Sequence, residues 1–212
     1  MPGGFNNENL TWVVESKDTG ELKERYDKWG AGYEKEIIVE GGFLAPAKAA
    51  EAVAARMPAD AKILDAGAGT GAVGAELAKR GFKHITGLDM SVGMLEVAKA
   101  KGVYEAFVQA ELGKKLDLET AAFDATTCVA TFTVGHAPAI ALEELARVTK
   151  PGGIVVFSLR PDIYEEHGFK EVQDRLAEQG KWKLAEHSDP YHPLPKTEPH
   201  VWYDQWVYEI LK

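Results

Sequence analysis

The chain has 212 residues, of which 45% are hydrophobic and 27% charged, so it is an ordinary globular protein and not a collagen-like, coiled-coil or wholly disordered chain. Its 33 acidic and 24 basic residues give a formal charge of −9, so we expect neither nucleic acid nor a membrane as a partner. The single Cys128 excludes an internal disulfide, and no signal peptide or long apolar run is present, which favours a cytoplasmic location.

The first 60 residues predict a tail followed by helices. Residues 1–19 are polar and rich in asparagine except at 10–14, so we expect a flexible N-terminal tail. Residues 20–39 and 43–57 are each expected to be helical. This leaves 20–212 as a single folded domain.

Short apolar runs alternate with amphipathic stretches from residue 61 to residue 159, which is typical of βαβ units in a parallel sheet. The predicted strands are 62–66, 84–88, 104–109, 125–130 and 154–159. The predicted helices are 72–80, 92–101 and 139–149, closed by Gly81, Gly102 and Pro151-Gly152. Further on, 169–179 predicts a helix, and 181–187 and 201–211 predict a β-hairpin rich in Trp and Tyr.

A glycine-rich loop follows the first of these strands, in Asp65-Ala66-Gly67-Ala68-Gly69-Thr70-Gly71. Glycines permit the tight turn and let a ligand approach bare backbone, and the following helix supplies amide donors at its N-terminus. Asp89, 18 residues beyond Gly71, ends the second strand, where an acid accepts hydrogen bonds from ribose hydroxyls. Together these features predict a nucleotide-like ligand.

A dinucleotide site is the main alternative, because residues 69–74 satisfy the GxGxxG pattern. Asp65 argues against it, since an acid there would repel a pyrophosphate, whereas it could hold the loop and face the ammonium group of a ligand. The terminal Trp- and Tyr-rich hairpin is also foreign to a plain dinucleotide fold. A tight turn that binds nothing is the other alternative.

The motifs together resemble those of the class I S-adenosylmethionine-dependent methyltransferases, over roughly residues 26–212. The run Asp65-x-Gly67-x-Gly69-x-Gly71 resembles their first motif, Asp89 their ribose-binding acid, and Lys150-Pro151-Gly152-Gly153 the turn before their fifth strand. Within the class, Tyr26-Asp27-x-Trp29-x-x-x-Tyr33 resembles the methyltransferase-like group named for the Williams-Beuren syndrome chromosome region. The resemblance implies an α/β fold with a Rossmann-like, seven-stranded, mostly parallel sheet, an antiparallel last strand and helices on both faces.

The resemblance also implies S-adenosylmethionine as cofactor and S-adenosylhomocysteine as product. It divides the domain into a helical lid at 20–60, a cofactor-binding core at 61–160 and a C-terminal helix and hairpin at 161–212. The residues that it places at the cofactor are Tyr26, Trp29, Tyr33, Asp65, Gly67, Ala68, Gly69, Gly71, Asp89, Met90 and Glu111.

Several of these roles have a structural alternative. Many relatives carry an Asp where this chain has Glu111, which could meet the adenine amino group or be a solvated loop residue. Met90 could pack on the adenine or in the core. Tyr26, Trp29 and Tyr33 share one helix face, which could close over the methionine end of the cofactor or only pack the helix onto the sheet.

Methyl transfer from a sulfonium needs alignment and exclusion of water, so we expect no metal and no covalent nucleophile. An oxygen or nitrogen acceptor can need a base, for which His136 is the candidate; a cap or surface histidine is the alternative. Tyr33 is the second catalytic candidate. Arg160 and Tyr191 lie where acceptor specificity would be set.

We therefore predict an S-adenosylmethionine-dependent methyltransferase that acts on a small-molecule acceptor by in-line displacement, as a monomer or weak homodimer. One alternative is a module that binds the cofactor without catalysis and serves as a regulator or partner of another protein. The other is an NAD-dependent oxidoreductase. Release of S-adenosylhomocysteine with candidate acceptors separates the enzyme from the module, and binding of the nicotinamide dinucleotide would identify the oxidoreductase.

Overall fold

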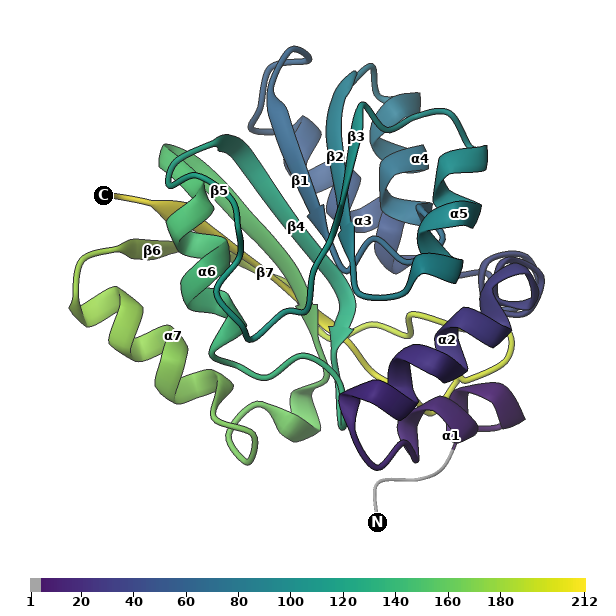
Figure 1. The fold of residues 1–212 in the computed structure, drawn as a ribbon. Coiled ribbons are helices and arrows are strands. Elements are labelled where there is room, and N and C mark those ends of the chain that lie inside the picture. The colour runs from purple at the N-terminus through teal and green to yellow at the C-terminus, as the bar shows by residue number, and fades with distance from the viewer. Residues whose placement is uncertain (1–4) are drawn as a thin grey trace.

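Seven strands form a single sheet in the computed structural model, which describes residues 5–212; residues 1–4 lie outside the described part. In spatial order the strands are β3 (Ala106–Gln109), β2 (His84–Asp89), β1 (Lys62–Ala66), β4 (Phe123–Phe132), β5 (Thr149–Leu159), β7 (Asp204–Ile210) and β6 (Trp182–His187). Strands β1 to β5 are parallel, and β7 is antiparallel to both β5 and β6. The predicted Rossmann-like sheet with an antiparallel last strand is therefore confirmed (Figure 1).

Helices cover both faces of this sheet. On one face lie α3 (Ala45–Ala54) and α4 (Ala72–Lys79), and on the other lie α6 (Ala141–Val148) and α7 (Phe169–Glu178) (Figure 1). Neighbouring residues of one strand point to opposite faces of the sheet. Ile63 packs in the hydrophobic cluster under α3 and α4, and Leu64 packs in the cluster under α6 and α7. Two further elements of this part of the chain are α5 (Val92–Ala100) and η2 (Pro161–Ile163). No helix within residues 5–212 is long and apolar enough to cross a membrane.

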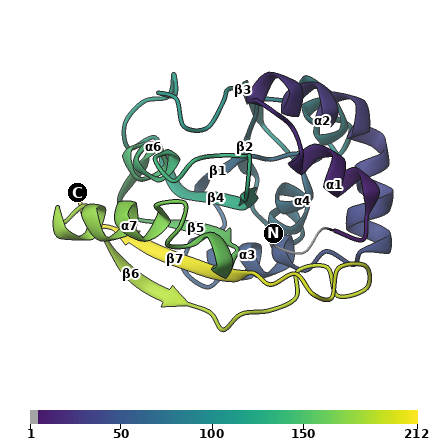
Figure 2. The same ribbon diagram turned by 90° about the horizontal axis from the view of Figure 1, so that it is seen from below.

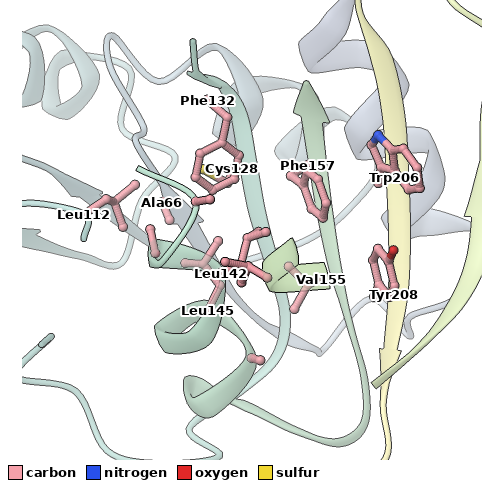
Figure 3. Close-up of a cluster of buried hydrophobic side chains, with 14 of the residues drawn as sticks. Ala66, Leu112, Cys128, Phe132, Leu142, Leu145, Val155, Phe157, Trp206 and Tyr208 are labelled. Carbon is pink, nitrogen blue, oxygen red and sulfur yellow. The ribbon is translucent and has the colours of Figure 1, made fainter. Parts of the chain in front are cut away.

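The core beneath α6 and α7 is rich in aromatic rings. The Phe157 ring lies parallel to the rings of Trp206 and Tyr208, with centroids 6.4 and 6.1 Å away (Figure 3). Cys128 lies in the same cluster with no exposed surface, and burial raises the pKa of its thiol (Figure 3). This packing joins the C-terminal hairpin to the parallel part of the sheet.

The N-terminal segment differs from the predicted flexible tail. Residues 8–14 form a helix, α1 (Glu8–Val14), whose N-cap Asn7 accepts a hydrogen bond from the Leu10 N–H. The backbone N–H groups of Asn6 and Asn7 each donate to the buried carboxylate of Glu198 at 2.8 Å, and Val13 is fully buried. The tail prediction is wrong for this part of the chain, because its anchoring partner lies more than 190 residues away. Residues 1–4 of the predicted tail are outside the described residues.

The helix predicted over 20–39 is two elements, α2 (Thr19–Tyr33) and a π-helix, η1 (Glu34–Glu40). α2 is kinked at Gly30, which has φ 2° and ψ −83°. The π-helix closes with a bond from the Gly41 N–H to the Glu36 carbonyl, five residues back. Figures 1 and 2 show α1 and α2 together at one end of the molecule, beside the C-terminal loop that precedes β7.

Strand β5 begins at Thr149 and not at the predicted residue 154, and α6 correspondingly ends at Val148. The pairing of β5 with β4 shifts register between Phe123 and Ala125, and Gly152 has a φ of +80° within this stretch. The Lys150-Pro151-Gly152-Gly153 run is thus an irregular strand entry, which local residue preferences alone read as a turn.

Candidate active site

A cavity of about 110 Å³ lies where the carboxyl ends of β1, β2 and β4 meet α2. Eight residues predicted for cofactor binding or catalysis line it: Tyr26, Tyr33, Gly67, Gly69, Asp89, Met90, Glu111 and His136. Four others do not: Trp29, Asp65, Ala68 and Gly71. Within residues 5–212, no three His, Cys, Asp or Glu side chains are grouped so that they could hold a metal ion.

The glycine loop is built by left-handed backbone at Gly67, Gly69 and Gly71, with φ of +74°, +53° and +86°. A Cβ on Gly67 would lie 2.2 Å from the Thr131 hydroxyl, so that position has no room for a side chain. A Cβ on Gly69 would meet nothing within 4 Å, so glycine is needed there for conformation only. The backbone of Gly69 thus faces open space in the cavity, which suits close approach of a ligand.

Asp89 connects the loop to β2 and retains capacity for a ligand. Its carboxylate accepts hydrogen bonds from the N–H of Gly69 at 2.8 Å and the N–H of Ser91 at 2.9 Å. An ionised carboxylate has about four acceptor positions, so about two remain for the hydroxyls of a ribose. Burial raises the pKa of Asp89, and these N–H groups oppose that shift.

The charge of the cavity suits a cationic nucleoside better than a dinucleotide. Asp89 and Glu111 both line it, and none of its described lining residues is Lys or Arg. Glu111 is paired with Lys114 at 2.6 Å, outside the lining. A sulfonium or ammonium group would be attracted here and a pyrophosphate repelled, so the donor set fits S-adenosylmethionine.

Asp65 lies beneath the glycine loop and is only 1% exposed. One carboxylate oxygen accepts from the Tyr104 hydroxyl at 2.7 Å and the other from the Thr127 hydroxyl at 3.0 Å. Burial raises the pKa of Asp65 to about 6, against the effect of those two hydroxyls. The geometry therefore gives Asp65 a part in holding the loop and no direct contact with the cavity.

Tyr104, which the sequence did not single out, also explains the last glycine of the GxGxxG pattern. Its hydroxyl accepts from the Gly74 N–H at 3.2 Å, and a Cβ on Gly74 would lie 2.2 Å from the Tyr104 ring. Gly74 is thus required by a tyrosine of the protein itself, so the pattern carries no evidence for a dinucleotide.

His136 lies opposite the loop and is bonded to Tyr26. Its Nδ1 is 3.0 Å from the Val134 carbonyl oxygen, which can only accept, so Nδ1 carries the proton. Nε2 therefore accepts from the Tyr26 hydroxyl at 2.8 Å. Burial lowers the pKa of His136, which favours the neutral imidazole, and the residue lines the cavity.

Trp29 packs behind the two tyrosines and is 5% exposed. Its ring centroid lies 6.2 Å from that of Tyr26 and 5.0 Å from that of Tyr33. Tyr33 does line the cavity, and burial raises the pKa of its phenol, which stays protonated. Of the three aromatic residues on this helix, the outer two therefore face the cavity and the middle one belongs to the core.

Sequence reasoning missed several lining residues, of which Thr19, Leu22, Met94, Leu112 and Thr131 come from four different segments. Leu22 had a detectable signal, because it precedes Tyr26 by four residues and so shares its helix face. Thr19 shares this face as well, three residues before Leu22, whereas the other three are brought to the cavity only by the tertiary fold.

Arg160, one of the two residues predicted at the acceptor edge, does not reach this cavity. It is 8% exposed, donates to both carboxylate oxygens of Asp162 at 2.9 and 2.5 Å, and lines a second cavity of about 650 Å³. Tyr191 lines neither of the two cavities. The structure thus separates the predicted acceptor-edge residues from the glycine loop.

Comparisons with known proteins agree with this geometry. A family profile described as "Methyltransferase domain" matches residues 64–157. The human Methyltransferase-like protein 27 is 34% identical over 165 residues, which is 74% of this chain and 66% of that protein. The chain belongs to the class I S-adenosylmethionine-dependent methyltransferases. Its cofactor is accordingly S-adenosylmethionine, and the product of that cofactor is S-adenosylhomocysteine.

Two other similar proteins match different shares of this methyltransferase and of their own chains. The Ubiquinone biosynthesis O-methyltransferase of Alkalilimnicola ehrlichii is 38% identical over 101 residues, 46% of this chain and 40% of that protein. The match thus spans less than half of that relative's length. Among solved structures, the [4+2]-cyclase SpnF has a TM-score of 0.68 over 92% of this chain and 96% of its own, at 15% identity. That likeness shows the fold alone.

Proposed function

We propose that this methyltransferase transfers a methyl group from S-adenosylmethionine to a hydroxyl group of a small molecule. The observation that carries the proposal is the neutral His136, which lines the same cavity as the glycine loop and Asp89 and whose Nε2 is the acceptor atom. The name of the Alkalilimnicola relative, an O-methyltransferase of ubiquinone biosynthesis, supports an oxygen acceptor on a small molecule.

The residues proposed to hold the cofactor are those that line the cavity around the loop. Asp89 would accept the ribose hydroxyls, and the backbone of Gly67 and Gly69 would lie against the methionine portion. Glu111 and Met90 would meet the adenine. When bound, S-adenosylmethionine supplies a methyl group on a positively charged sulfur, which is an activated leaving group.

His136 would then act as the general base at Nε2. The acceptor hydroxyl would take the place of the Tyr26 hydroxyl and donate its hydrogen bond to Nε2. As the proton moves to His136, the hydrogen bond from Nδ1–H to the Val134 carbonyl becomes charge-assisted and stabilises the imidazolium. Leu22, Met94 and Leu112 supply apolar walls that exclude water.

The first experiment is a calorimetric titration with S-adenosylmethionine, followed by detection of S-adenosylhomocysteine release with a panel of catechols, hydroxybenzoates and quinols. We expect binding and turnover with at least one phenolic hydroxyl. No binding at millimolar cofactor would overturn the cofactor assignment. Binding without turnover would favour the non-catalytic module, and turnover confined to amines or thiols would overturn the hydroxyl assignment.

The variant His136→Gln tests the base. We expect kcat to fall by about 100-fold or more while cofactor affinity is retained. His84→Gln is the matched control, because His84 is exposed and bonded to Glu105 at the opposite end of β2. Since burial lowers the pKa of His136 from 6.5, the acid limb of the kcat/KM profile of the wild type should have its midpoint below pH 6.5. An acid limb with its midpoint above pH 6.5 would contradict the assignment.

A further inference from the structure

Two tyrosine–acid pairs follow each other seven residues apart, Tyr26-Asp27 in α2 and Tyr33-Glu34 at the junction of α2 and η1. Both tyrosines line the cavity, whereas neither acid does. Each acid instead bonds to an element that carries the cofactor-binding residues. The repeat therefore couples each cavity-facing ring to an attachment point on the core.

The first attachment joins Asp27 to the start of α5. One oxygen of Asp27 accepts from the Ser91 hydroxyl at 2.6 Å and from the Gly93 N–H at 2.9 Å. The approach is close, because a Cβ on Gly93 would lie 2.7 Å from the Asp27 carbonyl oxygen. Ser91 is fully buried and its own N–H donates to Asp89. One side chain thus links α2 to the proposed ribose-binding acid.

The state of Asp27 favours this attachment. Lys23 donates to the second oxygen of Asp27 at 2.8 Å. Burial opposes ionisation, but the hydrogen bonds from Lys23, Ser91 and Gly93 together outweigh it and lower the pKa of Asp27. The carboxylate is therefore charged at any pH at which the protein would be assayed.

The second attachment joins Glu34 to the glycine loop itself. One oxygen of Glu34 accepts from the Thr70 hydroxyl at 2.5 Å, and the other is paired with Lys101 at 2.8 Å. Thr70 stands between Gly69 and Gly71 and is 1% exposed. Glu34 thus bonds to the glycine loop through Thr70 and to the end of α5 through Lys101.

α2 supplies one wall of the cavity, which includes both tyrosines. A ligand held between this wall and the glycine loop is released more easily when α2 moves away from the core. The kink at Gly30 lies between the two attachment points, which lets the two halves of the helix dock separately. Opening therefore breaks the bonds of Asp27, Glu34 or both.

We propose that Asp27 and Glu34 are positioning residues that dock α2 onto the cofactor-binding elements, so that closure of the helix and retention of the cofactor stabilise each other. Asp27 thereby holds the helix turn that carries Tyr26 in the cavity wall, and Glu34 holds the turn that carries Tyr33. This inference rests on the proposed function of the cavity, because the ligand that closure retains is the cofactor. The attachment itself is a property of the ligand-free protein.

The test compares Asp27→Ala and Glu34→Ala with the conservative variants Asp27→Asn and Glu34→Gln. Each amide keeps an oxygen that can accept from Ser91 or Thr70. Matched controls are Glu24→Ala on α2, whose side chain is exposed, and Glu40→Ala on η1, whose partner Lys35 is exposed. The two attachments lie on either side of the kink at Gly30, so one alanine variant that folds is sufficient.

Three measurements distinguish positioning from a merely structural role. S-adenosylmethionine should dissociate about tenfold faster from each alanine variant, in keeping with one lost hydrogen bond to a charged group, with little change in the association rate. Hydrogen exchange of the α2 amides should accelerate without cofactor while exchange in β1 and β4 stays as in the wild type. The conservative variants should recover most of both effects.

The outcomes separate the two proposals. Wild-type dissociation rates in both alanine variants would overturn the docking role, and so would faster exchange in β1 and β4 as well as in α2, which would indicate general destabilisation. If the wild type binds no S-adenosylmethionine, the proposed function fails with the coupling to the cofactor. Faster α2 exchange would then still show the attachment.

Discussion

The carboxyl ends of β1 and β2 are neighbours in the sheet, and each holds an aspartate whose pKa is raised by burial. At the end of β1, hydroxyls of Thr127 and Tyr104 bond to both oxygens of Asp65. At the end of β2, Asp89 meets backbone N–H groups and lines the cavity. An acid at a strand end thus takes its role from the hydrogen-bond donors around it.

The largest expected effect separates the two acids by pH. The pKa of Asp65 is about 6 in the folded protein against an ordinary value of 3.8, so the folded state binds this proton more tightly than the unfolded state. The contribution of Asp65 to the free energy of unfolding should therefore fall by roughly 3 kcal/mol as the pH rises from about 4 to about 6, and stay constant above that.

Urea unfolding of the wild type and of Asp65→Asn across this pH interval measures the effect as the change in their difference. Asp89→Asn serves as the comparison, since it keeps the Asp65 carboxyl and removes only a neighbouring charge that raises its pKa. A difference between wild type and Asp65→Asn that does not vary with pH would mean that Asp65 is not a buried, loop-holding acid.

A smaller effect is expected on ligand affinity. Asp89→Ala should weaken S-adenosylmethionine binding by about 2 kcal/mol, roughly 30-fold, because it removes the charge-assisted hydrogen bonds to the ribose. Asp65→Asn should weaken binding by less than about threefold, because Asp65 does not line the cavity. Calorimetry on both variants checks this, and a reversed order would break the comparison.

The smallest effect concerns the donors. Tyr104→Phe removes the hydroxyl that donates to Asp65 and that accepts from the Gly74 N–H. We therefore expect the free energy of unfolding to fall by about 1 kcal/mol and the pKa of Asp65 to rise further. Tyr208→Phe is the matched control, because its buried hydroxyl donates to Gln173 away from the site. Only Tyr104→Phe should alter how the free energy of unfolding depends on pH.

The core of the fold could be predicted because its signals are local. Alternating apolar residues identify strands, and the glycine loop and Asp89 lie within 22 residues of Gly67 in a recognisable order. Their side chains or backbone do line the cavity. The left-handed φ of Gly67, Gly69 and Gly71 follows from the same short run.

The partners that complete the site could not be predicted, because they join residues far apart in sequence. Tyr104 lies 39 residues from Asp65, Ser91 lies 64 residues from Asp27, and Thr70 lies 36 residues from Glu34. Each acid has several possible donors until the fold selects one. For Trp29, the sequence predicts the helix face that it shares with the two tyrosines, but not that its side chain is buried in the core.

The buried thiol of Cys128 is a natural probe of how often the core of this protein opens. Because the side chain has no exposed surface and its raised pKa suppresses the thiolate, alkylating reagents can reach it only when the core opens. The rate of alkylation under native conditions therefore reports how often that opening occurs. A ligand that binds only the folded state lowers the rate of Cys128 alkylation in proportion to its occupancy. Compounds can therefore be ranked as cofactor or acceptor candidates without any assay of turnover.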